Sequence, residues 1–347
     1  MNSQKKYIQL YMRIIDAISG GTYSPGDKLP TELDLAGMYC VSRQTVRQAL
    51  EKLESDGLIS KVQGSGSYIS ESASALKKTM RIAVITTYIS TYIFPSILRG
   101  IENVATSNRY SLMLSATNNS IAMERDILHN LSVNSVDGII VEGTKTALPN
   151  PNLSFYKALA DKNIPLVFFN GYYPELLEAR HDKIVYVVMD DYNGSYNMTV
   201  ELIRKGHRSI GGVFKSDDIQ GIRRFSGYID ALTKEEIDIN DDYIIWFNTE
   251  TKFSIEQQMS QSKMLSKCTA IVSYNDEIAL QIIATLEKTP NKVTALKSFD
   301  GTFSAQQTGI DFKSYSHPKE ILGRLAANKL FGIINGHSEE SCIMPWD

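Results

Sequence analysis

The segment from residue 81 onward alternates short apolar runs with stretches of helical period. Nine runs are rich in β-branched and aromatic residues: 81–87, 110–117, 137–143, 164–170, 185–191, 209–216, 243–248, 270–276 and 292–300. Between some of them lie stretches with the length of a crossover helix: 96–108, 197–206 and 276–288. Strands that are apolar throughout are covered on both faces, so the pattern predicts parallel sheets in a doubly wound α/β fold. Nine strands exceed one small unit, which predicts two subdomains, with chain crossings near residues 185–191 and after about Asp300.

The first 70 residues have a different pattern, that of three short helices followed by a hairpin. Thr31 and Ser42 are each suited to cap a helix. The helix after Thr31 has an apolar stripe of Leu33, Leu35 and Met38. The helix after Ser42 has an apolar face of Val46, Ala49, Leu50 and Leu53. Residues 58–70 place apolar positions on both sides of a Gly-Ser-Gly turn, which predicts the hairpin. Residues 71–80, "ESASALKKTM", have no periodicity. We therefore expect a small α+β domain over 1–70, a linker over 71–80 and the α/β domain over 81–347.

The helix expected after Ser42 has basic residues at its beginning and acidic residues at its end. Arg43 and Arg47 lie four residues apart, on a face beside the apolar one. Recognition helices present their N-terminal residues to DNA bases, where an arginine can donate two hydrogen bonds to guanine. The alternative is that both arginines only solvate an exposed helix. The neighbouring support helix, the tight turn, and Gly64 and Gly66, which let a backbone approach phosphates, favour DNA binding.

Composition limits the classes of function. The chain of 347 residues has a formal net charge of −3, and residues 1–78 carry ten Lys and Arg against eight Asp and Glu. This mild excess permits specific DNA binding near the N-terminus and argues against a non-specific coat on nucleic acid. The sequence has no apolar run of membrane-spanning length and no signal peptide, so we expect a cytoplasmic protein. Cys40, Cys268 and Cys342 are far apart, and we expect them to be reduced, without a disulfide or zinc site.

Polar residues follow several of the predicted strands. In open α/β sheets, ligands bind beyond the carboxyl ends of the strands, so these residues should converge on one crevice. With an arginine that begins a helix, the set is Glu142, Asn170, Arg224, Asn275, Asp276 and Asp300. Carboxylates, amides and a guanidinium suit hydroxyl groups, which both donate and accept, and Tyr92 and Phe94 could lie against the apolar face of a sugar ring. The alternative for any one of them is a helix N-cap, which suits Asp276 and Asn193.

The N-terminal domain also resembles a known family. Residues 23–70 look like the winged helix-turn-helix of GntR-type regulators, because "GDKLPTE", "VSRQTVRQAL" and "GLI" followed by a Gly-rich wing recur in order at the family spacing. The resemblance implies a set of DNA-binding residues: Glu32, Ser42, Arg43, Gln44, Thr45, Arg47, Gln63 and Gly64. It implies that the arginines contact bases or phosphates, that Glu32 accepts from cytosine, and that the wing residues reach the minor groove. For Glu32 the alternative is a favourable contact with the helix dipole.

The C-terminal domain resembles a second family. The motifs "VVMDDYNGSYNMTVELIRKGHRSIGGVF", "IRRFSGYIDAL", "AIVSYNDEIAL", "SFDG" and "SHPKEILGRLAANKLFGIING" look like the effector domain of LacI-type repressors, itself similar to periplasmic sugar-binding proteins. The likeness covers nearly all of 81–340 and implies effector binding by Asn170, Arg224, Asn275 and Asp300, with Glu142 matching less closely. The sequence departs from the family in two places. The segment before "KSFD" is shortened to "EKTPNKVTAL", and the chain stops at "CIMPWD", where the family continues through a final strand.

The pairing of the two domains resembles the L-arabinose-responsive repressors of Gram-positive bacteria, with "TTYISTYIFPSILRGIE", "TNNS" and "DGIIVEGTKTAL" in support. This implies a homodimer that binds operator DNA and is released by a small sugar, L-arabinose. Two alternative functions are a transport-type sugar-binding protein and an α/β sugar-processing enzyme. A transport-type protein would not need the N-terminal domain. The sequence has no phosphate loop, dinucleotide fingerprint, zinc-protease or serine-hydrolase motif. We therefore expect a regulator without enzyme activity, cofactor or metal.

Overall fold

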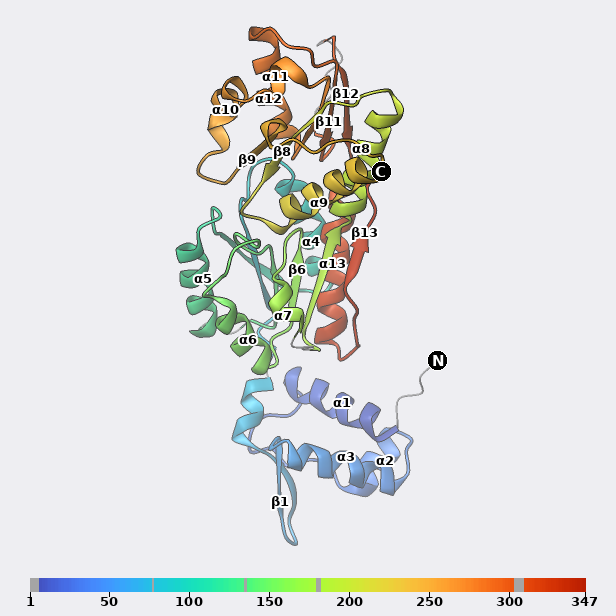
Figure 1. Ribbon diagram of the computed structural model, residues 1–347. Coiled ribbons are helices and arrows are strands. Elements are labelled where there is room, and N and C mark those ends of the chain that lie inside the picture. Colours follow the sequence, from blue (N-terminus) through green and yellow to red (C-terminus); the bar gives the residue numbers. More distant parts are fainter. Residues whose placement is uncertain (1–5, 77, 134–135, 179–181, 303–308) are drawn as a thin grey trace. The chain divides into compact units, whose positions relative to one another are not determined.

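The computed structural model describes residues 6–76, 78–133, 136–178, 182–302 and 309–347. The chain forms two compact units (Figure 1), unit 1 over Met1–Met80 and unit 2 over Arg81–Asp347. The boundary lies at the end of the stretch that we expected to be a linker. The first part of that stretch forms the 3-10 helix η1 (Glu71–Leu76).

Unit 1 has the helices and the hairpin that the pattern predicts: α1 (Lys6–Ser19), α2 (Glu32–Met38), α3 (Arg43–Ser55), β1 (Ile59–Val62) and β2 (Gly66–Ile69). The two strands pair antiparallel. Thr31 caps α2, because its Oγ1 accepts a hydrogen bond from the backbone N of Asp34, whose side chain in turn accepts from the backbone N of Thr31. Ser42 caps α3, because its Oγ accepts from the backbone N of Thr45 at 3.2 Å. Both caps were predicted, and they fix where the two helices begin.

The apolar face predicted for α3 is confirmed, but the stripe predicted for α2 is wrong. The four apolar residues of α3 are buried: Val46, Ala49, Leu50 and Leu53. In α2 only Leu35 is buried, whereas Leu33 is 63% exposed and Met38 is 61% exposed. Because each helical residue turns the chain by roughly 100°, Leu33 lies on the side of α2 opposite Leu35. This helix of seven residues therefore buries one leucine in the core of unit 1, with the partly buried Ala36 packed beside the core.

Unit 2 contains two parallel sheets, as predicted. The six-stranded sheet has the order β13-β7-β6-β5-β3-β4 and the five-stranded sheet the order β12-β11-β10-β8-β9. All neighbouring pairs are parallel. The strands are β3 (Arg81–Thr86), β4 (Ser111–Ala116), β5 (Gly138–Val141), β6 (Leu166–Phe169), β7 (Ile184–Met189), β8 (Ile210–Lys215), β9 (Ile244–Phe247), β10 (Ala270–Ser273), β11 (Ala295–Phe299), β12 (Asp311–Tyr315) and β13 (Cys342–Met344). We call the two halves subdomain 1, around the six-stranded sheet, and subdomain 2, around the five-stranded sheet.

Helices cover both faces of each sheet. Subdomain 1 is covered on one face by α4 (Phe94–Ser107) and α13 (Lys319–Ile334) and on the other by α5 (Ile121–Val133), α6 (Leu153–Asp161) and α7 (Pro174–Glu178). Subdomain 2 is covered by α8 (Asp191–Arg204) and α9 (Ile219–Lys234) on one face and by α10 (Ile255–Gln261), α11 (Met264–Lys267) and α12 (Asp276–Lys288) on the other. Short 3-10 helices precede and follow β9, namely η2 (Asp241–Tyr243) and η3 (Lys252–Ser254). No helix in the described part of the chain is long and apolar enough to cross a membrane.

Three segments connect the subdomains. The first follows Met189 at the end of β7, within the stretch predicted for a crossing. The second was predicted after about Asp300 but lies between Tyr315 and Lys319, because β12 extends the five-stranded sheet before the chain returns. The third was not predicted: β13 pairs with β7 of subdomain 1, and Trp346 then packs against Phe299 of subdomain 2 at a ring distance of 4.9 Å.

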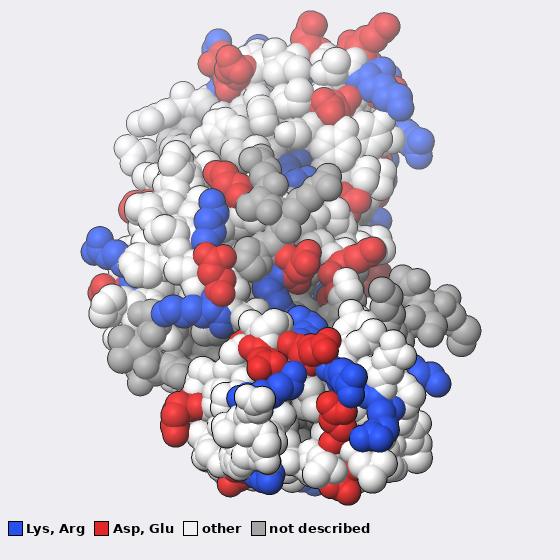
Figure 2. All heavy atoms as spheres, turned by 90° about the horizontal axis from the view of Figure 1, so that it is seen from below, with Lys and Arg blue, Asp and Glu red and all other residues white. Residues whose placement is uncertain are grey.

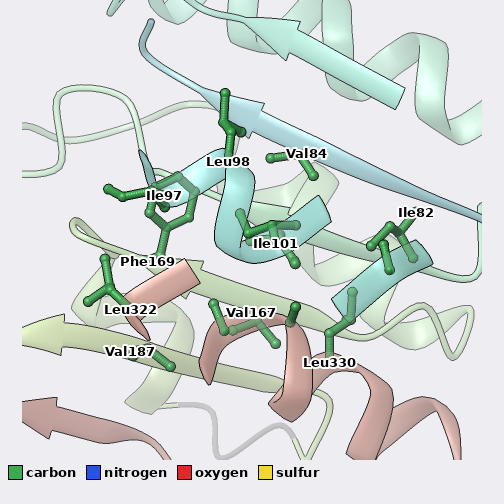
Figure 3. Close-up of a cluster of buried hydrophobic side chains, with 14 of the residues drawn as sticks. Ile82, Val84, Ile97, Leu98, Ile101, Val167, Phe169, Val187, Leu322 and Leu330 are labelled. Atoms are coloured by element: carbon green, nitrogen blue, oxygen red, sulfur yellow. The ribbon is translucent and has the colours of Figure 1, made fainter. Parts of the chain in front are cut away.

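The core of subdomain 1 brings α4 and α13 against the sheet (Figure 3). Ile97 and Leu322 of these helices are fully buried beside Val84 and Phe169 of the strands. The helices touch at a glycine on each side: a Cβ at Gly100 would lie 2.1 Å from the carbonyl O of Glu320, and one at Gly323 would lie 2.1 Å from the carbonyl O of Ile97. Only glycine permits backbones to approach so closely. The packed helices give a rigid support to the strand ends from which the site is built.

Candidate ligand cavity and nucleic-acid surface

A cavity of about 390 Å³ lies in unit 2, at the carboxyl ends of strands from both sheets. Its volume is within the roughly 300–1,000 Å³ that small-molecule sites occupy. The lining includes residues at or just after the ends of β3, β5 and β6 of subdomain 1 and of β8, β9, β10 and β11 of subdomain 2: Thr87, Tyr88, Glu142, Asn170, Lys215, Asp218, Phe247, Thr249, Tyr274, Asn275 and Asp300. The three connecting segments supply Asp191, His317 and Trp346. The cavity is thus bounded by both subdomains and by the segments that connect them.

The structure brings all but one of the predicted ligand residues to this cavity: Tyr92, Phe94, Glu142, Asn170, Arg224, Asn275 and Asp300. Asp276 does not line it. Its buried carboxylate accepts hydrogen bonds from the backbone N of Thr302 at 2.6 Å and from Ser314 Oγ at 2.6 Å. The predicted alternative for Asp276, a helix N-cap, is also wrong, because Asn275 caps α12 by accepting from the backbone N of Ile278 at 3.1 Å. Asp276 therefore supports the loop behind the cavity wall.

The other predicted cap, Asn193, is not the N-cap of α8. Asp190 occupies that position, and its side chain accepts from the backbone N of Asn193 at 3.1 Å. Asp190 precedes the helix by one residue, as a cap must, whereas Asn193 lies in its first turn.

Arg224 is the central cation of the cavity. It lies on α9, is buried, and donates from Nε at 2.9 Å and from Nη2 at 2.8 Å to Oδ1 of Asp191. Its Nη1 donates to the carbonyl O of Tyr274. Burial raises the pKa of Asp191 to about 6, and the positive charge of Arg224 acts in the opposite direction. The pair holds the planar guanidinium in one orientation, and a planar fork of this kind can donate to a ligand hydroxyl in a fixed direction.

Aromatic rings surround the guanidinium. Its central carbon lies 4.1 Å from the ring centre of Phe299, 4.9 Å from that of Tyr274 and 5.1 Å from that of Trp346. The ring of His317 packs edge-on to Trp346 at 5.0 Å. Burial lowers the pKa of His317 to about 3, so this histidine is uncharged at neutral pH. The cavity therefore places a fixed guanidinium beside apolar ring surfaces, a combination that suits the face of a sugar ring.

Two buried carboxylates face the cavity from opposite subdomains. Glu142 accepts from the backbone N of Thr87 at 2.9 Å and from Asn170 Nδ2 at 3.2 Å. Asp300 accepts from the hydroxyl of Tyr92. Burial raises the pKa of both carboxyl groups, against the opposing effect of these hydrogen bonds and, for Asp300, of Arg224. Each carboxylate is held by a neutral donor in subdomain 1, so each keeps acceptor capacity for a bound hydroxyl group.

Lys215 and Asp218 also line the cavity, although the sequence analysis did not select them. Lys215 Nζ lies 2.9 Å from Asp218 Oδ2 and 3.2 Å from Asp217 Oδ1. Asp218 caps α9 through the backbone N of Gly221 at 2.9 Å, and it accepts from Tyr274 Oη at 2.7 Å. Lys215 is the last residue of β8 and Asp218 lies in the loop after it, so the rule applied to the other strand ends would have found them. Trp346 had no such signal, because its position depends on β13.

The chemistry of the lining is that of a binding site. Two of its cations are paired with carboxylates, Arg224 with Asp191 and Lys215 with Asp218. No group of three or more His, Cys, Asp or Glu residues that could hold a metal ion occurs among the residues that the structure describes. The three cysteines are free thiols. Donors and acceptors alternate around apolar rings, and this arrangement recognises a molecule rich in hydroxyl groups.

In unit 1, the start of α3 forms an exposed polar surface. Arg43, Gln44 and Arg47 are exposed, and Arg47 has 63% of its side-chain area accessible. Ser42 Oγ and Thr45 Oγ1 lie 2.9 Å apart at the same end of the helix. Acidic Asp56, at the other end, is engaged by Tyr11 Oη at 2.6 Å and by Lys52. The start of the helix thus presents basic side chains to solvent.

Glu32 and the wing extend this surface. Glu32, the first residue of α2, lies 3.3 Å from Nη2 of Arg47, so it acts on the arginine as well as on the dipole of its own helix. Gln63 and Gly64 are exposed in the turn between β1 and β2, and Gly64 has a left-handed φ of +75° that favours glycine. Basic and acidic side chains are interspersed on the face drawn in Figure 2, without a continuous basic surface. DNA contacts would therefore depend on individual residues more than on a broad field.

A winged helix-turn-helix followed by a two-sheet unit with a ligand cavity defines a ligand-responsive DNA-binding regulator as the class of protein. Residues 6–69 match the family model for bacterial regulatory proteins of the gntR family, and residues 79–345 match that for periplasmic binding proteins and the sugar-binding domain of the LacI family. The chain belongs to the LacI-type sugar-binding family and carries a gntR-type DNA-binding domain.

Known proteins agree with this assignment. The chain is 36% identical to the arabinose metabolism transcriptional repressor of Geobacillus stearothermophilus, over 96% of this chain and 92% of the relative. It is 34% identical to the repressor of the same name from Halalkalibacterium halodurans, over 95% and 90%. The crystal structure of transcription regulator CcpA of Lactococcus lactis shares the fold at a TM-score of 0.65, with 21% identity over 78% of this chain and 96% of that one. The predicted class is confirmed: a sugar-responsive, DNA-binding transcriptional repressor and not an enzyme.

Proposed function

We propose that the protein represses sugar-utilisation genes by binding an operator as a homodimer in the cytoplasm, and that L-arabinose in the cavity releases it. The observation that carries the proposal is the lining of the cavity, where Arg224, Glu142 and Asp300 meet aromatic rings at the junction of the two subdomains. The 36% identity to an arabinose metabolism repressor over nearly the whole chain supports L-arabinose as the sugar.

In the proposed complex, both subdomains bind the same sugar. Asn170 and Glu142 of subdomain 1 and Asn275 and Asp300 of subdomain 2 hydrogen-bond to hydroxyl groups, and Arg224 donates to a further oxygen. Tyr92 and Phe94 lie against an apolar face of the ring. A ligand that contacts both subdomains stabilises the arrangement in which they are close together, because only that arrangement makes both sets of contacts.

For the DNA, we propose that Arg43 and Arg47 donate to base edges or phosphates in the major groove and that Glu32 accepts from cytosine. The remaining contacts are to phosphates and the minor groove: Ser42, Gln44 and Thr45 at phosphates, and Gln63 and Gly64 in the wing. A homodimer presents this set twice, so the operator should contain two half-sites at a fixed spacing.

Release requires that the sugar bind the two arrangements of the subdomains unequally. If closure changes the distance between the DNA-binding units of a dimer, half-site spacing no longer matches and specific affinity falls. A tenfold loss of operator affinity needs a coupling free energy of only about 1.4 kcal/mol. Such a coupling is smaller than the energy of one charge-assisted hydrogen bond, about 1.5–3 kcal/mol.

The test uses the full chain and an operator selected from a random DNA duplex library. Fluorescence anisotropy of the selected duplex should show release on addition of L-arabinose. D-galactose is the matched control, because its ring carries the same hydroxyl configuration with one additional hydroxymethyl group. We expect weaker release by D-galactose and none by D-ribose. If the protein keeps the duplex at saturating L-arabinose but releases it on addition of another sugar, that sugar and not L-arabinose is the effector. Failure to select any duplex would overturn the DNA-binding assignment.

A further inference from the structure

Two loops of subdomain 1 contact subdomain 2 beside the cavity. They contain the motifs "TNNS" (117–120) and "EGTKTAL" (142–148), most of whose residues have no part in the proposed sugar contacts. We propose that these loops form a latch that holds the subdomains closed, and that its ion pair Lys145–Glu250 sets the affinity for the sugar. The latch consists of Asn119, Lys145 and Thr146 in subdomain 1 and Asp217, Ile219, Thr249 and Glu250 in subdomain 2. The inference rests on the proposed function only for the identity of the sugar.

Asn119 is the centre of the latch. It is buried, and its Nδ2 donates to Asp217 Oδ2 at 3.4 Å and to Thr249 Oγ1. Its Oδ1 accepts from the backbone N of Lys145 at 3.0 Å. Asp217 in turn accepts from the backbone N and the hydroxyl of Thr249, at 3.0 Å and 2.7 Å. One buried amide therefore joins both loops of subdomain 1 to the loop after β9 of subdomain 2.

The ion pair closes the outer side of the latch. Lys145 Nζ donates to Glu250 Oε1, and the two side chains are 17% and 59% exposed. The hydrogen bond from Lys145 lowers the pKa of Glu250 below its ordinary value. Thr146 Oγ1 accepts from the backbone N of Ile219 at 2.9 Å, at the start of α9. Lys145 and Glu250 do not belong to the cavity lining, so they can change closure without touching a bound sugar.

The loops of subdomain 1 are held in a fixed conformation. Asn118, Asn119 and Lys145 have left-handed φ values of 47°, 56° and 48°. Asparagine adopts this conformation more readily than other residues, whereas Lys145 keeps it only where the surroundings impose it. Here the second loop is tied to the buried carboxylate of Glu124 through Tyr173, whose hydroxyl donates to Glu124 at 2.8 Å and accepts from the backbone N of Thr144 at 2.7 Å. The same carboxylate accepts from Asn150, Asn152 and Tyr156.

The ion pair Lys145–Glu250, which does not line the cavity, acts on a bound sugar through the population of the closed state. If the sugar binds the closed arrangement, its apparent dissociation constant is the intrinsic constant divided by the closed fraction. An exposed ion pair contributes about 0.2–1 kcal/mol, which corresponds to about a 1.4- to fivefold change in that equilibrium. Reversing one charge also adds a repulsion of similar size. We therefore expect K145E or E250K to weaken sugar binding by about two- to 25-fold, and the double reversal K145E/E250K to restore it.

The matched control is the ion pair between Lys263 and Asp242. It is also exposed, with Nζ 2.5 Å from Oδ2, but both residues belong to subdomain 2. Its charge reversals K263D and D242K should leave sugar affinity unchanged. This separates closure from a general effect of surface charge.

Closure itself is measured without any sugar. Lys157 of α6 and Glu287 of α12 are exposed, and each is replaced by Cys to carry a spin label, in a chain whose Cys40 and Cys342 are replaced by Ser. Labelled chains are diluted into unlabelled ones. The distance between the two labels then reports the distance between the subdomains. Each single reversal should shift the distance distribution towards a more open arrangement, and the double reversal should return it. Unchanged distributions in both single variants, or no recovery in the double variant, would overturn the latch. If the wild-type protein does not bind L-arabinose in a calorimeter, the proposal that L-arabinose is the effector is refuted. The distances between the spin labels still test the latch in that case.

Discussion

Replacing Arg224 by Lys tests how the cavity is organised. The guanidinium donates twice to Asp191, at 2.9 Å and 2.8 Å, and once to the carbonyl O of Tyr274, with the ring of Phe299 4.1 Å from its central carbon. A lysine keeps the charge but cannot make these bonds and donate to a sugar in a fixed plane. Losing one hydrogen bond that involves a charged group costs about 1.5–3 kcal/mol. We therefore expect L-arabinose to bind about 10- to 150-fold more weakly to R224K.

The assay is titration calorimetry with L-arabinose, accompanied by operator anisotropy. R224K should bind the operator as wild type does, and it should need correspondingly more sugar for release. Arg204→Lys is the control, because Arg204 is exposed in the last turn of α8, outside the cavity lining. Unchanged sugar affinity in R224K would refute the central role of the guanidinium. Loss of operator binding without sugar would show that Arg224 supports the fold and not a sugar contact.

Three further results are expected. Arg43→Ala and Arg47→Ala should each weaken operator binding by about 1–3 kcal/mol and leave sugar affinity intact; an unchanged operator affinity would refute the contacts of α3 with DNA. Sugar affinity should fall between about pH 7 and about pH 5, because burial raises the pKa of Asp191 to about 6 and the protonated acid no longer attracts Arg224; an Asp191→Asn variant with an equally steep profile would contradict this. Sugar should change the intrinsic fluorescence through Trp346, so Trp346→Phe should abolish the change and Trp246→Phe should retain it; the reverse would place the signal outside the cavity.

Much of the fold was predictable because burial on both faces of a parallel strand leaves a continuous apolar run. The interior strands among the nine have such runs and are mostly buried, as in β5, β6 and β11. The edge strands β4 and β9 were predicted from their apolar residues, although they are partly exposed. The two strands that were missed are also at sheet edges and contain few apolar residues: β12 reads "DFKSY" and β13 reads only "CIM". An edge strand needs no apolar run, because it pairs with a neighbouring strand along one edge and is exposed to solvent along the other.

The cavity was predictable in part for a related reason. Parallel strands end at a common edge, so the residue after each strand is placed by topology before any side chain is considered. That rule located Glu142, Asn170 and Asp300. It could not locate Trp346, which reaches the cavity only because β13 pairs with β7. It also included Asp276, since a one-residue shift at a helix start decides whether a side chain faces the cavity or the loop behind it.

Release of the operator by sugar is tested most directly by the thermodynamic reciprocity between the two ligands. Calorimetry gives the affinity for L-arabinose of the free protein and of the operator-bound protein, and anisotropy gives operator affinity with and without saturating sugar. We expect the operator to weaken L-arabinose binding by the same factor by which L-arabinose weakens operator binding. Equal sugar affinities for the free and the operator-bound protein would contradict the claim that sugar in this cavity releases the DNA.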